Sequence, residues 1–213
     1  MTRIATLTRR AYRSLTTGGR RFYSPDMHIT APDEAIADAL LVITGAQPRC
    51  GSTKVVAVDG PSGAGKTEFA ATLAARLPGA QVLHMDDLYP GWGGLIRAVT
   101  DLHRLVLAPL ASGEPAGYRR WDWQEHRYSG WQEVPATGLL VVEGVGSGAN
   151  PGWELESALI WLEAEQDQRL RRGIERDGEA YLPHWREWAA LEGALFQVDA
   201  TRSRADLIIN TTS

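Results

Sequence analysis

The sequence predicts an α/β fold in which a five-stranded parallel sheet carries helices on both faces. Three observations support this prediction: short apolar segments, helical patterns between them, and a glycine-rich loop directly after the first apolar segment. The expected strands lie at residues 54–59, 81–85, 139–142, 158–162 and 205–210, and the expected helices lie at residues 66–77, 94–110, 163–177 and 180–197. Strands that alternate with helices are typical of right-handed crossovers between parallel strands.

The first expected strand and the helix after it form the clearest pair. Residues 54–59 are rich in valine and alternate little in polarity, which is typical of a strand buried on both faces of a sheet. In the next segment Phe69, Leu73 and Leu77 recur at four-residue spacing and form an apolar stripe, and the Pro-Gly pair that follows supplies a stop. The sequence therefore predicts a strand, a loop and a helix in direct succession.

Two further segments complete the expected organisation. Residues 32–45 predict a short helix with four apolar side chains on one face, namely Ile36, Ala39, Leu40 and Ile43. Residues 111–137 are rich in Gly, Pro, Trp and Tyr, and the segment is long for a plain connection. We expect it to be irregular and to bind a ligand.

Composition limits the classes of function. The chain has 213 residues and a net charge of −4, so it suits one domain and has no electrostatic footprint for nucleic acid. Its apolar runs are shorter than the ~20 residues that cross a bilayer, which predicts no membrane contact. Cys50 is the sole cysteine, which excludes internal disulfides and favours a cytoplasmic protein with a buried thiol. A homo-oligomer stays open.

The amino-terminal segment differs from the rest of the chain. Residues 1–30 are rich in arginine, carry no acid before Asp26 and lack the apolar core of a secretory signal. We expect a loosely attached extension, although an organellar transit peptide would look similar. Residues 31–213 are then a single domain, with an acceptor-binding insertion at about 87–137 and a lid at about 163–180.

The glycine-rich loop has the pattern G-x-x-x-x-G-K-[ST] of a phosphate-binding P-loop, which predicts the P-loop NTP hydrolase fold. Glycines let the backbone turn tightly, so that its N–H groups meet a polyphosphate at the positive end of a helix. Lys66 is expected to reach the β- and γ-phosphates, and Thr67 offers a hydroxyl to Mg²⁺. The expected nucleotide-binding residues are Gly60, Ser62, Gly63, Ala64, Gly65, Lys66, Thr67 and Glu68.

Acidic residues follow two of the other expected strands. Asp86 and Asp87 come after the second strand, and Glu143 ends the third. Ligands of open α/β sheets lie beyond the carboxyl ends of the strands. A carboxylate there can hold Mg²⁺ or accept the proton of an attacking hydroxyl, but it can also cap a helix or a turn.

Arginines gather on one face of the expected helix at residues 163–177. Arg169, Arg172 and Arg176 lie at i, i+3 and i+7. Acids begin this helix and arginines end it, which complements the helix dipole and suits any solvated helix. The alternative is a mobile arginine face that closes over a transferring phosphoryl group.

At this point the sequence resembles a family, the uridine kinase-like branch of P-loop small-molecule kinases, which is related to pantothenate kinase and phosphoribulokinase. The resemblance rests on GPSGAGKT, MDDLY, WDWQEH, VVEG and RLRRGIERD, and on the final ADLIIN. It covers residues 54–210 and leaves the first fifty residues unmatched.

The resemblance implies roles for individual residues. Asp86 would take the proton from the acceptor hydroxyl, and Glu143, with Thr67 and Asp86, would hold Mg²⁺. Lys66, Arg172 and Arg176 would neutralise the phosphates of ATP. The acceptor would be bound by Tyr89, Trp121, Asp122, His126 and Arg169. Two departures concern the segment after Tyr89, which lacks the family's ribose-contacting aspartate, and Gly173, which replaces a lid arginine.

These observations favour a kinase that depends on ATP and Mg²⁺ and phosphorylates a hydroxyl of a small molecule, most simply a pyrimidine nucleoside. A second hypothesis changes the acceptor to pantothenate or another metabolite alcohol. A third is an ATP-binding regulator that hydrolyses slowly. Against the third, the chain has no Asn-Lys-x-Asp element for reading guanine.

Overall fold

The computed structural model describes residues 32–178 and 182–212. The expected extension at residues 1–30 therefore lies outside the described residues. In the part of the chain that is described, no helix is long and apolar enough to cross a membrane.

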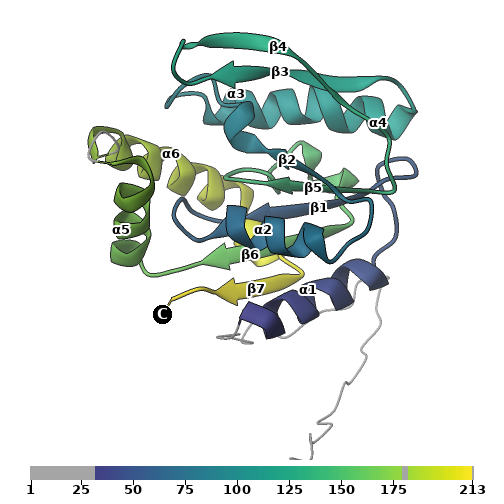
Figure 1. Cartoon of the computed structure of the whole chain (residues 1–213), viewed down its shortest axis with the longest axis horizontal. Coiled ribbons are helices and arrows are strands. Elements are labelled where there is room, and N and C mark those ends of the chain that lie inside the picture. Colours follow the sequence, from purple (N-terminus) through teal and green to yellow (C-terminus); the bar gives the residue numbers. More distant parts are fainter. Residues whose placement is uncertain (1–31, 179–181, 213) are drawn as a thin grey trace, which may run out of the picture.

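A five-stranded parallel sheet forms the centre of the molecule, as the sequence predicts (Figure 1). The strand order is β2 (Gln81–His84), β5 (Leu139–Glu143), β1 (Lys54–Asp59), β6 (Ala158–Glu163) and β7 (Leu207–Asn210). Each neighbouring pair is parallel. All five strands therefore end at the same edge of the sheet, and α5 (Gln166–Asp177) lies at this edge in Figure 1.

The central strands are buried on both faces, which explains their continuous valine-rich sequence. Val56, Val58 and Val141 pack on one face, in a core cluster that contains residues of α1 (Pro32–Gly45) and α2 (Lys66–Ala75). Val55 and Val142 pack on the opposite face, in a second cluster. Successive side chains of a strand point to opposite faces, so each strand serves both cores.

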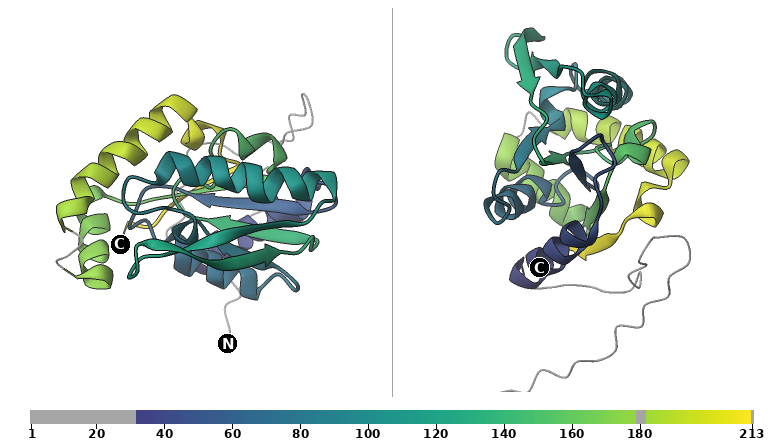
Figure 2. Two further views of the ribbon diagram at one scale, coloured as in Figure 1. Left: turned by 90° about the horizontal axis from the view of Figure 1, so that it is seen from above. Right: turned by 90° about the vertical axis from the view of Figure 1, so that its right-hand side faces the viewer.

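The second core is covered by a longer helical layer, which Figure 2 shows from two further sides. It consists of α3 (Leu95–Asp101), a π-helical segment (Leu102–Leu107) and α4 (Ala108–Ser112), together with α6 (Leu182–Asp199). The helix expected at residues 94–110 is thus confirmed with a π-helical middle. Three short helical elements were not predicted: the 3-10 turns at Met85–Asp87 and Gly152–Leu155, and α7 (Thr201–Arg204).

The expectation of an irregular segment at residues 111–137 is wrong. The chain forms an antiparallel hairpin of β3 (Ala116–Asp122) and β4 (Arg127–Val134), with a register shift between Arg119 and Trp121. Tyrosine, tryptophan and valine favour strands, and here they outweigh the glycines and prolines on which the expectation rested. Ala116, Tyr118 and Val134 bury one side of the hairpin in the second core.

Candidate active site

The loop between β1 and α2 has the backbone that close approach to a ligand requires. Gly60, Gly63 and Gly65 have φ angles of 138°, 79° and 86°, which favour glycine. At Gly60 an added Cβ would lie 1.9 Å from the carbonyl oxygen of Leu162. Helix α2 begins at Lys66, and no side chain caps its first turn. The helix N-terminus can therefore offer its amide groups and its positive dipole end to an anion.

Lys66 is buried inside this loop. The residue is only 7% exposed, and its Nζ donates a hydrogen bond of 3.0 Å to the carbonyl oxygen of Pro61. Burial lowers the pKa of the ammonium group, whereas the negative charges of Glu192, Glu143, Asp59 and Asp86 raise it. A buried cation among acids and amide donors is well placed to pair with a polyphosphate.

Glu143 is the centre of a polar cluster at the strand ends. It ends β5 in register with His84 of β2, and Nδ1 of His84 lies 2.6 Å from Oε1 of Glu143. That hydrogen bond raises the pKa of His84. Oγ1 of Thr67, in the first turn of α2, lies 3.3 Å from both oxygens of Glu143. The structure therefore brings together Thr67 and Glu143, as predicted, and adds His84.

Asp86 follows β2 in a 3-10 turn (Met85–Asp87) beside this cluster. Desolvation raises the pKa of its carboxyl group, and the charge of Glu143 raises it further, whereas Arg176 and Lys66 lower it. Since the residue is open to solvent, water moderates this rise. Asp86 thus lies within electrostatic reach of Glu143, Lys66 and Arg176, the residues expected to share its site.

The hairpin is attached to the same turn. Asp87 accepts hydrogen bonds from the Tyr118 hydroxyl at 3.2 Å and from Nε of Arg120 at 2.8 Å. Nε1 of Trp123, at the hairpin turn, donates to the backbone oxygen of Asp86 at 3.0 Å. The segment expected to bind the acceptor therefore contacts the acids that follow β2.

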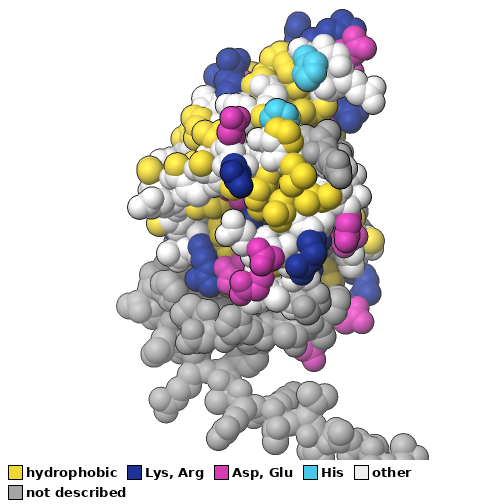
Figure 3. Space-filling view, turned by 90° about the vertical axis from the view of Figure 1, so that its left-hand side faces the viewer, with side chains coloured by type: hydrophobic (Ala, Val, Ile, Leu, Met, Phe, Trp, Pro, Cys, Tyr) yellow, Lys and Arg dark blue, Asp and Glu magenta, His cyan; other side chains and the backbone are white. Residues whose placement is uncertain are grey.

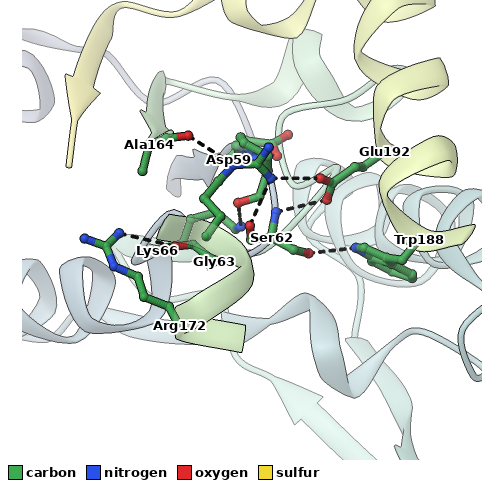
Figure 4. Close-up of polar contacts among 11 residues, drawn as sticks. Asp59, Ser62, Gly63, Lys66, Ala164, Arg172, Trp188 and Glu192 are labelled. Atoms are coloured by element: carbon green, nitrogen blue, oxygen red, sulfur yellow. Dashed lines mark hydrogen bonds and ion pairs between the residues drawn. The ribbon is translucent and has the colours of Figure 1, made fainter. Parts of the chain in front are cut away.

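The predicted lid residues of α5 contact the phosphate loop. Nη1 of Arg169 donates to the carbonyl oxygen of Ser62 at 3.2 Å, and Nη1 of Arg172 donates to that of Gly63 at 3.3 Å. At Gly63 an added Cβ would lie 2.4 Å from the carbonyl oxygen of Arg169, so α5 packs directly on the loop. Figure 4 shows Arg172 directed toward Gly63.

Helix α6 contacts the loop from another side, which the sequence did not indicate. Figure 4 shows Trp188 and Glu192 projecting from this helix toward Ser62. Nothing in the sequence distinguishes these two residues from others of α6, since their role depends on where the helix packs. A shallow cleft of about 270 Å³ lies beside the loop and is lined by Pro61, Trp161, Glu163, Ala164, Glu165, Gln166 and Asn210.

Aromatic side chains gather between the hairpin turn and α6. Trp92 stacks on His184 with ring centroids 4.8 Å apart, and it meets Trp123 and Trp188 edge to face at 5.2 and 6.0 Å. Figure 3 views the end of the molecule where the sheet strands terminate, and hydrophobic side chains form a central patch there with charged side chains around it. Trp123 of this aromatic cluster also contacts Asp86, and an apolar surface near that carboxylate suits an organic acceptor.

Of the residues expected to bind the acceptor, one is buried in the core and three lie in the hairpin. Tyr89 is buried, and its hydroxyl donates to the carbonyl oxygen of Val145 at 2.8 Å. Trp121 packs edge to face on Tyr128, with ring centroids 5.0 Å apart. Oδ1 of Asp122 accepts the amides of the hairpin turn, and His126 occupies that turn with a φ of 49°. Substrate contact by these residues stays a prediction.

Comparisons with known proteins agree with this geometry at the level of the fold. No protein-family model matches the chain. A solved structure described as a possible uridine kinase, from Bacillus stearothermophilus, superposes with a TM-score of 0.61 at 18% identity, over 83% of this chain and 98% of that one. The chain has the fold of uridine kinase-like P-loop kinases. A Silicibacter sp. TM1040 protein proposed to be a fructose transport system kinase shares this fold, with a TM-score of 0.54 at 20% identity, over 84% of this chain and 99% of that one.

A curated relative supports the same resemblance in sequence. Uridine-cytidine kinase C of Dictyostelium discoideum is 29% identical over an alignment of 105 residues, and the match covers 45% of this chain and 23% of that protein. The chain thus matches about a quarter of the length of this relative. In the structure the phosphate loop, the strand-end acids and the arginine helix lie at the same edge of the sheet.

Proposed function

We propose that this protein transfers the γ-phosphoryl group of ATP to a hydroxyl of a small molecule, and that the acceptor is a pyrimidine nucleoside. One observation carries the proposal: an uncapped helix N-terminus with a buried lysine faces two strand-end carboxylates, those of Glu143 and Asp86. Phosphoryl transfer needs an anion-binding loop, a cation at the terminal phosphates and an acid that orients the acceptor. A binding protein without transfer chemistry would not need the last of these.

The reaction is a direct displacement at the γ-phosphorus. The acceptor hydroxyl gives its proton to the carboxylate of Asp86 while its oxygen forms a bond to the phosphorus. The bond to the bridging oxygen breaks, and its electron pair leaves with ADP. Because desolvation and Glu143 raise the pKa of Asp86, its carboxylate is a stronger base than an ordinary aspartate. Lys66, Arg172 and Arg176 would stabilise the negative charge on the phosphates.

The donor set at the strand ends fits Mg²⁺. Thr67 supplies a hydroxyl and Glu143 a carboxylate, which are the hard oxygen ligands that this ion prefers, and Asp86 is then available to accept the proton of the acceptor. The ion would neutralise charge on the β- and γ-phosphates when it is bound. The protein's own residues would orient the nucleotide through the loop amides and would hold the acceptor against the hairpin.

The aromatic cluster supports a flat organic acceptor, since aromatic rings stack on heteroaromatic bases. The proposed acceptor is tested by a panel of uridine, cytidine, pantothenate and fructose with labelled ATP and Mg²⁺. We expect phosphorylation of uridine or cytidine. Exclusive phosphorylation of pantothenate or fructose would replace the nucleoside, and ATP hydrolysis that no acceptor accelerates would contradict a kinase.

Two substitutions test the proposed roles. Lys66→Ala should fold but lose about 10²–10³-fold in activity, as is usual when one preorganised donor is removed. Asp86→Asn should bind ATP as the wild type does and should stop transfer. Glu114→Gln removes an exposed acid near the end of α4 and is the matched control, which should leave turnover unchanged. Equal turnover by wild type and Asp86→Asn would refute the base.

A further inference from the structure

Ser62 of the phosphate loop is held at all three of its polar atoms by the helices that follow β6. Its backbone N–H donates to Oε2 of Glu192 at 2.9 Å, and its Oγ accepts Nε1 of Trp188 at 2.7 Å. Its carbonyl oxygen accepts Nη1 of Arg169 at 3.2 Å. Trp188 and Glu192 are four residues apart and share one face of α6. The loop is therefore joined to α5 and α6 at this residue.

Glu192 is a buried carboxylate at the centre of these contacts. It is 3% exposed, and Oε1 lies 3.3 Å from Nη1 of Arg169, whose side chain is 14% exposed. A buried carboxylate is costly unless cations and hydrogen-bond donors surround it. Glu192 has both, since it receives the amide of a loop built to bind anions and the guanidinium of a predicted lid arginine.

Glu192 binds the phosphate loop and lies within electrostatic reach of Lys66, the residue expected to meet the terminal phosphates. A P-loop lysine reaches the β- and γ-phosphates. Burial lowers the pKa of Lys66, and the negative charge of Glu192 is among those that oppose this shift, so the two side chains share one electrostatic environment. A γ-phosphate that pairs with Lys66 would therefore approach the carboxylate of Glu192, which is already bound to Ser62 and Arg169. The two negative charges would repel each other.

We propose that Glu192 is the internal anion of the phosphate loop, which competes with the terminal phosphate of the nucleotide and holds Arg169 until that phosphate replaces it. The inference rests on the proposed nucleotide-binding function. In the free protein, Glu192 pairs with Arg169 and with the Ser62 amide. When a triphosphate binds, Arg169 exchanges the carboxylate for phosphate oxygens, so that the lid arginine is delivered only to a loop that contains the terminal phosphate.

Glu192→Gln tests this competition, because the amide keeps the shape of the side chain and an acceptor for Ser62 but loses the charge. Calorimetric titration with ATP, ADP and AMP should show ATP binding about tenfold tighter than in the wild type, a smaller gain for ADP and none for AMP. A merely structural role of Glu192 would change all three affinities together. Glu187→Gln makes the same charge change at an exposed position of α6 and should match the wild type.

The outcomes separate the two proposals. If the wild type binds ATP and Glu192→Gln binds it equally or more weakly, the competition is overturned while the proposed function stands. If no variant binds a nucleoside triphosphate, the proposed function fails and this inference fails with it. Should Glu192→Gln not fold, Glu192→Asp shortens the side chain by one methylene and moves the carboxylate away from the loop. That variant should bind ATP more tightly than the wild type, by a factor smaller than ten. An unchanged ATP affinity would overturn the proposal.

Discussion

At the scale of single residues, two adjacent aspartates have different surroundings. Asp86 is surrounded by the charges of Glu143, Lys66 and Arg176, whereas Asp87 pairs with Arg120 and accepts the hydroxyl of Tyr118. One carboxylate is thus directed to the proposed chemistry and the other to the hairpin. The family resemblance had implied the base role for Asp86 alone, whereas the contacts of Asp87 with the hairpin depend on packing and carry no signal in the sequence.

Asp87→Asn should weaken acceptor binding without affecting nucleotide binding. The substitution removes the ion pair that holds the hairpin against the turn, so the KM for the acceptor should rise several-fold while the Kd for ATP stays the same. Global stability should fall by less than about 1 kcal/mol, because Arg120 is largely exposed. Steady-state kinetics and calorimetry measure the two effects. Glu125→Gln is the control, because this hairpin acid pairs with Arg127 of the hairpin itself. An equal rise of the acceptor KM in that variant would contradict the specific role of Asp87.

The candidate site was predictable where its signals are local. The phosphate loop is a contiguous motif whose glycine spacing indicates the conformation of its backbone, so residues 60–67 could be assigned to nucleotide binding together. Glu192 and His84 carry no such signal, because their contacts with Ser62 and Glu143 arise from packing between distant segments. Asp122 was expected to bind the acceptor, but in the structure its carboxylate accepts the backbone N–H groups of its own hairpin turn.

At the scale of elements, the junction between α5 and the phosphate loop depends on Gly63. This residue has a φ of 79°, and an added Cβ would lie 2.4 Å from the carbonyl oxygen of Arg169. Gly79 has the same φ of 79°, but its surroundings leave open space for a Cβ. The pair therefore separates backbone strain from the contact between helix and loop.

Gly63→Ala should introduce both backbone strain and a clash with α5, whereas Gly79→Ala should introduce backbone strain alone. We expect Gly79→Ala to lose about 1–2 kcal/mol in the free energy of unfolding and to keep nucleotide affinity. Gly63→Ala should lose more and should also bind ATP more weakly, because α5 must move away from the loop. Chemical denaturation and calorimetry on both variants provide the comparison. Equal losses of stability with unchanged ATP affinity would show that α5 does not need this contact.

The hairpin marks the limit of prediction at this scale. Its two strands pair mainly with each other, and much of β4 is exposed, so the apolar alternation that identifies a half-buried strand is weak. The sheet strands have the opposite property. They are buried on both faces, and their continuous apolar runs were sufficient to locate all five, within about three residues at each end.

At the scale of the whole molecule, one buried acid joins the phosphate loop to the segment that follows the neighbouring strand β5. Asp59 ends β1, is fully buried, and accepts backbone N–H groups from Gly60 at 2.6 Å and from Gly146 and Gly148 at 2.9 Å each. The first donor belongs to the phosphate loop and the others to the segment after β5. Burial nevertheless raises the pKa of Asp59 from 3.8 to about 6, while these hydrogen bonds and Lys66 oppose the rise.

This pKa predicts how stability depends on pH. Between about pH 4 and 6 the folded protein holds a proton on Asp59 that the unfolded chain releases. The stabilisation of the folded state by this proton is therefore full below pH 4 and is lost as the pH rises through 6. The loss amounts to about 3 kcal/mol. Other groups titrate in the same range, so the informative quantity is the difference in unfolding free energy between wild type and Asp59→Asn. Asparagine has no such proton, and its changed hydrogen bonding to the three amides adds an offset that does not vary with pH. Urea titrations from pH 4 to 7 should therefore show the variant gaining relative to the wild type as the pH rises, and a difference that stays constant would mean that Asp59 is ionised throughout.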